Sequence, residues 1–338
     1  MRSFRYVGNA DVKRVLTPAD AVRVAEQTLA DHAVGAIDWA DPRQLDLWPE
    51  LEVTRYKVKG CLLRRPGVAG FRVTGLNRTE AGKTASALRP TKHILLSDVT
   101  TSEFFGIVDE RWGYGLRTGA GAAVAMKHLH APGSDEVTVL GTGHMAWGAA
   151  HAVAAAVPLR RMRIWSPTPA KREAFAARLA DELGIEVVAV ATAQDAVTDV
   201  PMVVTATEAP EPVLETAWFA PGVTIYALGR LQELPFEAYR TFTFMADDTE
   251  QIRVCAEIKQ LISEGGYSDD WVTTQLADVV GGLHPGRTSD DERILMRSQG
   301  LVTMDVAQAL WVYEEASRRG LGIDLEPAIE EREGDPLF

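Results

Sequence analysis

A glycine-rich turn between an apolar strand and an alanine-rich helix is the stretch of this sequence best suited to bind phosphate. The strand Val137–Leu140 runs into Gly141-Thr142-Gly143-His144-Met145-Ala146, which has the form GxGxxA. In such a turn the first glycine permits a tight bend, the second lets the backbone approach a pyrophosphate, and the small last residue allows close helix packing. N–H groups at the start of the helix attract phosphate oxygens. Gly141 and Gly143 are therefore predicted to bind a dinucleotide.

The end of the next strand, Arg161–Trp165, bears on which dinucleotide would bind. A dinucleotide site of this kind has an acid about 20 residues after the turn when it holds a free ribose 2′-hydroxyl. Here that region carries no acid. It offers the small hydrogen-bonding residues Ser166 and Thr168, followed by Lys171 and Arg172. This pattern favours NADP over NAD, with ordinary helix-surface charge as the alternative reading of the two cations.

Strand and helix alternate around this turn, which predicts a parallel sheet with helices on both faces. The expected strands are Val137–Leu140, Arg161–Trp165, Ile185–Val190, Met202–Ala206, Val223–Leu228 and Thr241–Ala246. The expected helices are Thr118–Leu129, Gly141–Val157 and Pro169–Leu183.

The residues before and after this region do not show this regular alternation of strand and helix. A helix is expected at Pro18–Ala33, because Thr17 can cap it and proline suits its first turn. Short antiparallel strands are expected at Glu52–Lys59, Cys61–Arg65, Ala69–Thr74, His93–Asp98 and Phe104–Val108. A last helix is expected at Val302–Arg319, with an apolar stripe for core or interface packing at Val302, Val306, Leu310 and Tyr313.

Composition narrows the function classes. The chain has 338 residues, enough for about two domains, and a net charge of −12, which argues against a nucleic-acid partner. Its two cysteines and seven histidines form no metal-ligand spacing, so no metal site is predicted. No stretch is apolar enough for a signal peptide or a membrane span, so a cytoplasmic protein without a membrane partner is expected.

Several motifs in order resemble the ornithine cyclodeaminase/mu-crystallin family. The resemblance covers about Arg55 to Gly320. It rests on Arg117-Thr118-Gly119-Ala120, the turn at Gly141, Val204-Thr205-Ala206-Thr207, Gly222–Gly229, Gly286-Arg287-Thr288-Ser289-Asp290-Asp291-Glu292 and Arg297-Ser298-Gln299-Gly300.

The resemblance implies a homodimer in which a Rossmann-type domain is inserted into a smaller α+β domain. Residues 117–300 would form the dinucleotide-binding domain. Residues 1–116 and 301–338 would form the substrate-binding and dimerisation domain. The family pattern places the cofactor against Gly141, Thr142, Gly143, His144, Met145, Ser166, Thr168, Lys171, Thr205, Ala206, Thr207, Ala227, Leu228, Gly229 and Gln299.

The same pattern proposes substrate residues, with two departures from the family. Arg117 matches the arginine that binds the substrate carboxylate, and Arg55 matches a second pocket arginine more loosely. Arg72 stands where many members have a lysine, and Arg230 stands where the family has a catalytic aspartate after Gly229. Because an arginine stays protonated at neutral pH, Arg230 does not replace that base. It is expected to act at the catalytic position as a permanent cation that holds a substrate carboxylate or an oxyanion.

Cyclodeamination of ornithine requires such a base, and arginines would repel the ornithine ammonium. The sequence therefore favours an NAD(P)H-dependent oxidoreductase that moves hydride to or from the α-carbon of an imino or N-substituted amino acid, with a small carboxylate-bearing substrate. Several arginines would suit a second substrate carboxylate. The alternatives are an ornithine cyclodeaminase with rearranged catalytic groups and a non-catalytic protein that retains NADP. Lys57, Tyr114 and water remain candidate proton donors.

Overall fold

The computed structural model describes residues 4–47, 54–77, 91–229 and 231–325. The chain divides into two compact units. The first comprises Met1–Leu16, Ile37–Trp112 and Asp305–Phe338, and the second comprises Thr17–Ala36 and Gly113–Met304.

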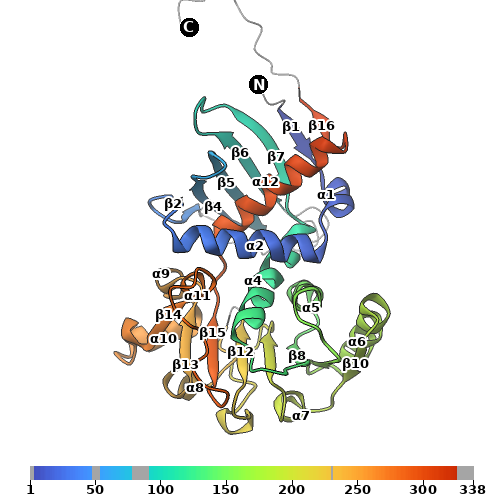
Figure 1. The fold of residues 1–338 in the computed structure, drawn as a ribbon, viewed down its shortest axis with the longest axis vertical. Coiled ribbons are helices and arrows are strands. Elements are labelled where there is room, and N and C mark those ends of the chain that lie inside the picture. The colour runs from blue at the N-terminus through green and yellow to red at the C-terminus, as the bar shows by residue number, and fades with distance from the viewer. Residues whose placement is uncertain (1–3, 48–53, 78–90, 230, 326–338) are drawn as a thin grey trace, which may run out of the picture. The chain divides into compact units, whose positions relative to one another are not determined.

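A parallel sheet forms the centre of the second unit, as predicted (Figure 1). Its order is β10-β9-β8-β11-β12-β15-β13-β14, and every neighbouring pair is parallel. The direction of winding reverses between β8 and β11, which is where doubly wound sheets bind their ligands. The strands are β8 (Glu136–Leu140), β9 (Arg161–Trp165), β10 (Glu186–Ala189), β11 (Met202–Thr205), β12 (Thr224–Ala227), β13 (Thr243–Ala246), β14 (Val272–Gln275) and β15 (Ile294–Arg297).

Helices cover both faces of this sheet, and its central strands β8, β11, β12 and β15 are buried along their whole length. In β12, Ile225 and Ala227 join one apolar cluster, whereas Tyr226 faces Gly121 on the other side. The helical segments are α2 (Pro18–Ala33), α4 (Gly113–Leu129), α5 (His144–Ala156), α6 (Pro169–Leu183), α7 (Ala193–Val197), η1 (Thr216–Trp218), α8 (Phe236–Thr241), α9 (Thr249–Ile252), α10 (Ala256–Ser263), η2 (Asp269–Trp271) and α11 (Leu276–Val280).

Helices α4 and α5 cross at glycines. A Cβ atom on Gly119 would lie 2.2 Å from the carbonyl oxygen of Gly148, and one on Gly148 would lie 2.0 Å from that of Gly115. The backbones therefore approach more closely than side chains would permit. This contact fixes α4 against the helix that begins at the glycine-rich turn.

Arg287 ties together three segments at the amino ends of β12 and β15. Its guanidinium donates to the carbonyl oxygens of Leu129, Gly222 and Ser289 and to the hydroxyl of Thr224. The motif around Arg287, which carried part of the family resemblance, therefore has a structural role at the edge opposite the glycine-rich turn.

Replacing Arg287 by alanine should lower the free energy of unfolding by about 2–4 kcal/mol, because several carbonyls, most of them part-buried, would lose a donor together. Urea denaturation measures this change. Arg160→Ala is the control, since Arg160 is an arginine at the same edge whose side chain is 61% exposed. Equal losses of unfolding free energy in the two variants would show that the hydrogen bonds of Arg287 do not stabilise these segments.

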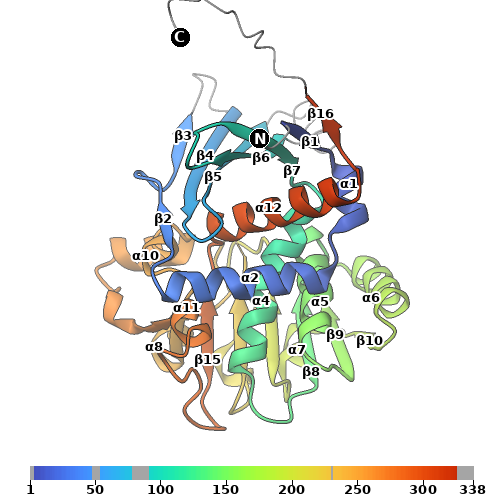
Figure 2. The same cartoon turned by 45° about the horizontal axis from the view of Figure 1, so that its top comes forward.

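The first unit is a mainly antiparallel sheet crossed by α12 (Val302–Arg318) on one face (Figure 2). Its order is β16-β1-β7-β6-β5-β4-β2, with β3 on β4. The apolar stripe of α12 is buried as expected, and Tyr313 meets Phe105 edge to face at 5.0 Å. The other elements are β1 (Arg5–Val7), α1 (Asn9–Val15), β2 (Ile37–Trp39), β3 (Leu45–Leu47), β4 (Thr54–Leu63), β5 (Val68–Asn77), β6 (Thr91–Asp98), β7 (Phe104–Asp109) and β16 (Ile323–Asp324).

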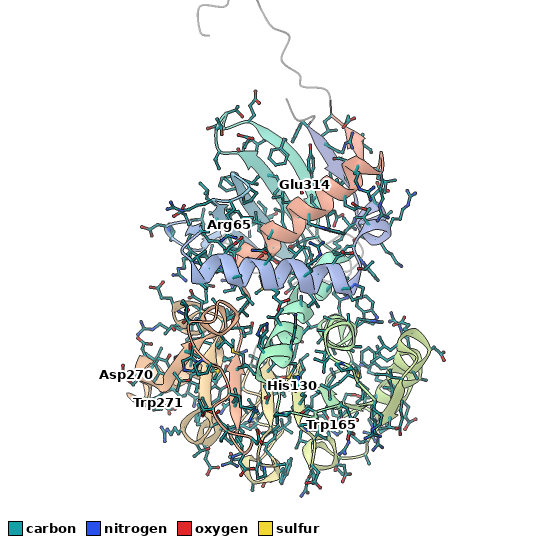
Figure 3. The ribbon with its side chains drawn as sticks, viewed as in Figure 1. Arg65, His130, Trp165, Asp270, Trp271 and Glu314 are labelled. Atoms are coloured by element: carbon teal, nitrogen blue, oxygen red, sulfur yellow. The ribbon has the colours of Figure 1, made fainter. Side chains whose placement is uncertain are left out.

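The prediction of two strands on either side of Gly60 is wrong. A single strand, β4, continues through this glycine, because the whole of β4 pairs with β5 and Gly60 lies opposite Phe71. Glu52, the expected first residue, lies outside the described residues. The turn after β4 exposes Arg65, and Glu314 is exposed on α12; Figure 3 labels both.

Candidate active site

The glycine-rich turn lies at the switch point of the parallel sheet. Gly141 has a φ of +116°, and a Cβ atom there would lie 2.4 Å from the carbonyl oxygen of Ala206. Its N–H donates to the carbonyl of Trp165 at 2.8 Å, and the N–H of Ala206 donates to Leu140 at 2.8 Å. The bend that was predicted for Gly141 thus joins the ends of β9, β8 and β11.

Gly143 leaves room beside the start of α5. A Cβ atom on Gly143 would meet no atom within 4 Å, and Gly143 caps the helix without a side-chain hydrogen bond. His144 is exposed and lies parallel to Trp147, with ring centroids 5.9 Å apart. An open glycine at the amino end of a thirteen-residue helix fits a pyrophosphate, so these residues suit a dinucleotide.

The end of β9 is suited to a ribose that carries a 2′-phosphate. Ser166 is buried and follows Trp165, which Figure 3 labels. The Arg172 guanidinium donates to the Ser166 carbonyl at 3.2 Å, which holds this cation beside the strand end. Thr168 and Lys171 are exposed next to it. No carboxylate hydrogen-bonds Ser166 or Thr168 in the part of the chain that the structure describes.

Glu233 organises the ends of β11 and β12, a role that the sequence did not reveal. Its carboxylate accepts the Thr205 hydroxyl at 2.7 Å and the N–H groups of Thr207 and Gly229 at 2.6 and 2.7 Å. The Glu233 side chain is 3% exposed, and burial raises its pKa. Its three donors fix two loops that were expected to border the cofactor.

Asp247 organises the turn after β15 in the same way. One oxygen, Oδ2, accepts the Ser298 hydroxyl and the N–H groups of Gln299 and Gly300 at 2.7–2.9 Å. The side chain is 4% exposed, and burial raises its pKa. The Cys255 thiol donates to the Gln299 side-chain oxygen at 3.1 Å. The amide nitrogen of Gln299 therefore points away from the thiol.

Arg117 lies in α4 beside this turn. Arg117 is 6% exposed, and its guanidinium carbon lies 5.5 Å from the centre of the Tyr114 ring. Gly300 has a φ of +86°, and a Cβ atom on it would lie 2.8 Å from Nη1 of Arg117. A buried guanidinium against bare backbone is suited to a carboxylate, because a desolvated bidentate contact is strong.

All the predicted cofactor residues of the second unit therefore gather at one edge. Carboxyl ends of parallel strands meet at a common edge, and the predicted residues lie at or after the ends of β8, β9, β11, β12 and β15. Thr142 and Leu228 lie in the loops after β8 and β12, Met145 lies in the first turn of α5, and Ala227 is the last residue of β12.

Arg55 and Arg72 lie in the first unit, in ion pairs. Nε of Arg55 donates to Asp46 at 2.8 Å. Arg72 donates to Glu110 from Nε and Nη2, and Asp305 lies 3.6 Å from its Nε. These carboxylates offset both cations. Arg230, the predicted catalytic residue, lies outside the described residues, and the side chain of Lys57 is half-buried on β4.

Among the described residues, no three or more His, Cys, Asp or Glu side chains are grouped to hold a metal ion. None of the described helices is long and apolar enough to cross a membrane.

A model of the ornithine cyclodeaminase/mu-crystallin family matches residues 11–320. A Delta(1)-pyrroline-2-carboxylate reductase of Bacillus cereus is 29% identical over 239 residues, which are 69% of this chain and 73% of that protein.

Two solved structures share the fold. The iminosuccinate reductase of Paracoccus denitrificans, in complex with NAD+, has a TM-score of 0.88 at 24% identity and covers 96% of this chain and 100% of its own. An archaeal alanine dehydrogenase dimer with bound NAD has a TM-score of 0.86 at 23% identity and covers 96% and 99%. The predicted Rossmann-type fold is confirmed by these likenesses.

Proposed function

Since the chain belongs to the ornithine cyclodeaminase/mu-crystallin family, we propose that it reduces the C=N bond of an imino acid with NADPH. It is an NAD(P)-dependent oxidoreductase that acts at the α-carbon of imino or amino acids. The direction toward reduction, the choice of NADPH and the residue roles below are our proposals.

The observation that carries the proposal is the buried Arg117 in the same unit as the dinucleotide turn. Arg117 is 6% exposed and packs against Gly300, whose loop follows β15. This burial and packing support a role for Arg117 as the carboxylate-binding cation at the edge where the strands of the sheet end. A substrate held there by its carboxylate would present its α-carbon at the proposed cofactor edge.

One substrate carboxylate is enough for this site. The sequence suggested a second carboxylate, because several arginines were expected in the pocket. Asp46 offsets the charge of Arg55, and Glu110 and Asp305 offset that of Arg72. Arg117 is the proposed anchor because it is buried beside Gly300 in the unit that holds the dinucleotide turn, and a monocarboxylate such as a cyclic imino acid meets its requirement.

Held at Gly141 and Gly143, NADPH would supply the hydride for the imine carbon and leave as NADP+, while the imine nitrogen would gain a proton. The chain's own part is to hold the carboxylate, orient the C=N bond and provide a route for the proton. Lys57, Tyr114 and water are the proposed sources of the proton. The pH profiles of Lys57→Met and Tyr114→Phe distinguish them, because loss of the true donor removes the basic limb of the profile.

A panel of compounds tests the proposal. Cyclic imino acids, and 2-oxo acids mixed with amines, are incubated with enzyme and NADPH while the absorbance of NADPH is followed. Turnover with a carboxylate-bearing imine supports the proposal. Tight NADPH binding without turnover of any compound would instead favour a protein that merely retains the cofactor.

We propose NADPH rather than NADH because Arg172 is held beside Ser166 at 3.2 Å. Wild-type protein should bind NADPH at least about tenfold more tightly than NADH, and Arg172→Ala should remove about that factor, since a charge-assisted hydrogen bond contributes about 1.5–3 kcal/mol. Fluorescence titration measures both constants. Lys171→Ala, which changes the exposed neighbouring cation, should have a smaller effect. Equal affinities in the wild type would refute this preference.

We also propose a cytoplasmic homodimer, with residues 117–300 as the cofactor domain and residues 1–116 and 301–338 as the substrate and dimerisation domain. The face of the first sheet opposite α12 exposes apolar side chains of a kind that dimers bury. They are Leu45, Leu47, Tyr56, Phe71 and Phe104. The archaeal alanine dehydrogenase with the same fold is a dimer.

Charges on that face should separate the subunits. Phe71 and Phe104 contact each other with ring centroids 6.1 Å apart and are 39% and 50% exposed. The double variant Phe71→Asp, Phe104→Asp should be monomeric by light scattering, because two carboxylates would be buried in each half of the interface. Val34→Asp, at an apolar residue of the second unit that is 62% exposed, should remain dimeric. A monomeric wild type would contradict the proposal.

A further inference from the structure

A second feature of the carboxyl edge is an arginine that is buried completely. Arg297, the last residue of β15, is 1% exposed and is paired with Glu257 of α10, which is 2% exposed. A buried charge is costly unless it is paired and hydrogen-bonded. Figure 1 shows α10 beside β13 and β14, so this partner comes from outside the cofactor loops.

The remaining hydrogen bonds of Arg297 go to backbone carbonyls at the strand ends. Nη1 donates to the carbonyls of Ala227 and Ser298 at 2.9 and 2.8 Å, and Nη2 donates to that of Gly229 at 2.7 Å. These donors are directed at the protein and not at a ligand. Arg297 therefore acts on the backbone that follows β12 and β15.

Glu233 holds the same glycine from its other side. The N–H of Gly229 donates to Glu233 at 2.7 Å, while its C=O accepts from Arg297. A Cβ atom on Gly229 would lie 2.0 Å from the Glu233 carboxyl carbon, so the fit requires glycine. Both backbone polar groups of one residue are thus fixed by buried side chains of opposite charge.

We propose that Arg297 and Glu233 are positioning residues that fix the peptide at Gly229, and with it the wall against which the nicotinamide ring lies. The inference rests on the proposed function, because it takes the carboxyl edge of β12 as the nicotinamide end of the site. Neither residue touches the substrate. Each acts through the backbone of Gly229, and the geometry of hydride transfer is the property that they control.

The first test replaces each residue conservatively. Arg297→Lys and Glu233→Gln should lower kcat by about 10- to 100-fold, since a misplacement of about 1 Å costs about that much in rate. KM for the imino acid should stay within about threefold, because Arg117 is unchanged. The primary isotope effect with NADPH deuterated at the transferred position should rise, because hydride transfer becomes more rate-limiting.

A second readout needs no turnover. The emission spectrum of bound NADPH reports the surroundings of the nicotinamide, and it should shift or weaken in both variants while the dissociation constant changes by less than about threefold. If no imino acid is turned over by wild-type enzyme, the proposed function fails. The emission spectra still test the positioning role in that case.

Arg287→Lys is the matched control, because Arg287 is also an arginine whose guanidinium donates to several backbone carbonyls, at the opposite edge of the sheet. It should lower the melting temperature without changing the isotope effect or the emission spectrum. If Arg297→Lys does not fold, Glu257→Gln keeps the guanidinium and removes its counter-charge, with the same expected shifts. Variants of Arg297, Glu233 or Glu257 that lose stability with wild-type isotope effect and emission would overturn the proposal.

Discussion

Replacing Arg117 by alanine should lower kcat/KM for the imino acid by about 30- to 4000-fold. Breaking one partner of a desolvated arginine–carboxylate pair costs about 2–5 kcal/mol, and each 1.4 kcal/mol is a factor of ten. KM should rise, because the carboxylate is held in the ground state as well as in the transition state. Steady-state kinetics with NADPH measure the effect.

Two related variants separate charge from geometry. Arg117→Lys should keep the positive charge but lose the planar pair of N–H donors that a carboxylate accepts. Its kcat/KM should therefore stay at least about tenfold below that of the wild type. Gly300→Ala should impair the enzyme while leaving Arg117 present, because a Cβ atom there would lie 2.8 Å from Nη1 and the φ of +86° disfavours alanine. Wild-type kinetics in Arg117→Ala would remove this arginine from the site.

Gly143→Val should abolish measurable NADPH binding while leaving the protein folded. A Cβ atom on Gly143 meets nothing within 4 Å, and the φ of −87° suits any residue, so the free energy of unfolding should change by less than about 1 kcal/mol. The added methyl groups would occupy the space proposed for the pyrophosphate. Fluorescence titration should show a dissociation constant raised at least about 100-fold, and Gly143→Ala should lie in between.

Gly141→Ala provides the contrast. With a φ of +116° and a Cβ atom 2.4 Å from the Ala206 carbonyl oxygen, this variant should lose stability as well as binding. Normal NADPH affinity in Gly143→Val would show that the turn does not hold the cofactor.

The parallel sheet was predictable because its signals are local. The bounds of α2, β9 and α6 match the predicted ranges, since a threonine cap, a strand of alternating apolar residues and a terminal glycine mark them within a few residues. β15 was missed because its residues, Ile294–Arg297, end in a charge that only the folded protein buries. Pairing with Glu257, 40 residues away, supplies the compensation.

The site was predictable where a motif encodes backbone shape and not where distant side chains meet. Gly141 and Gly143 follow from the turn that they make. Glu233 and Asp247 are acids in irregular segments, and the sequence does not reveal that Thr205, Gly229 or Gly300 donate to them. Such contacts depend on tertiary packing between strand ends that are far apart in the chain.

The most direct test of the central claim compares two compounds that the two candidate reactions would each convert to proline. Enzyme is incubated with Delta(1)-pyrroline-2-carboxylate and NADPH, and separately with ornithine and NAD+ or NADP+, while proline, ammonia and the reduced cofactor are measured. Imine reduction predicts one NADPH consumed for each proline formed, and neither proline nor ammonia from ornithine. Proline and ammonia formed from ornithine at a comparable rate, without net change in the reduced cofactor, would show that the chain is a cyclodeaminase and not an imine reductase.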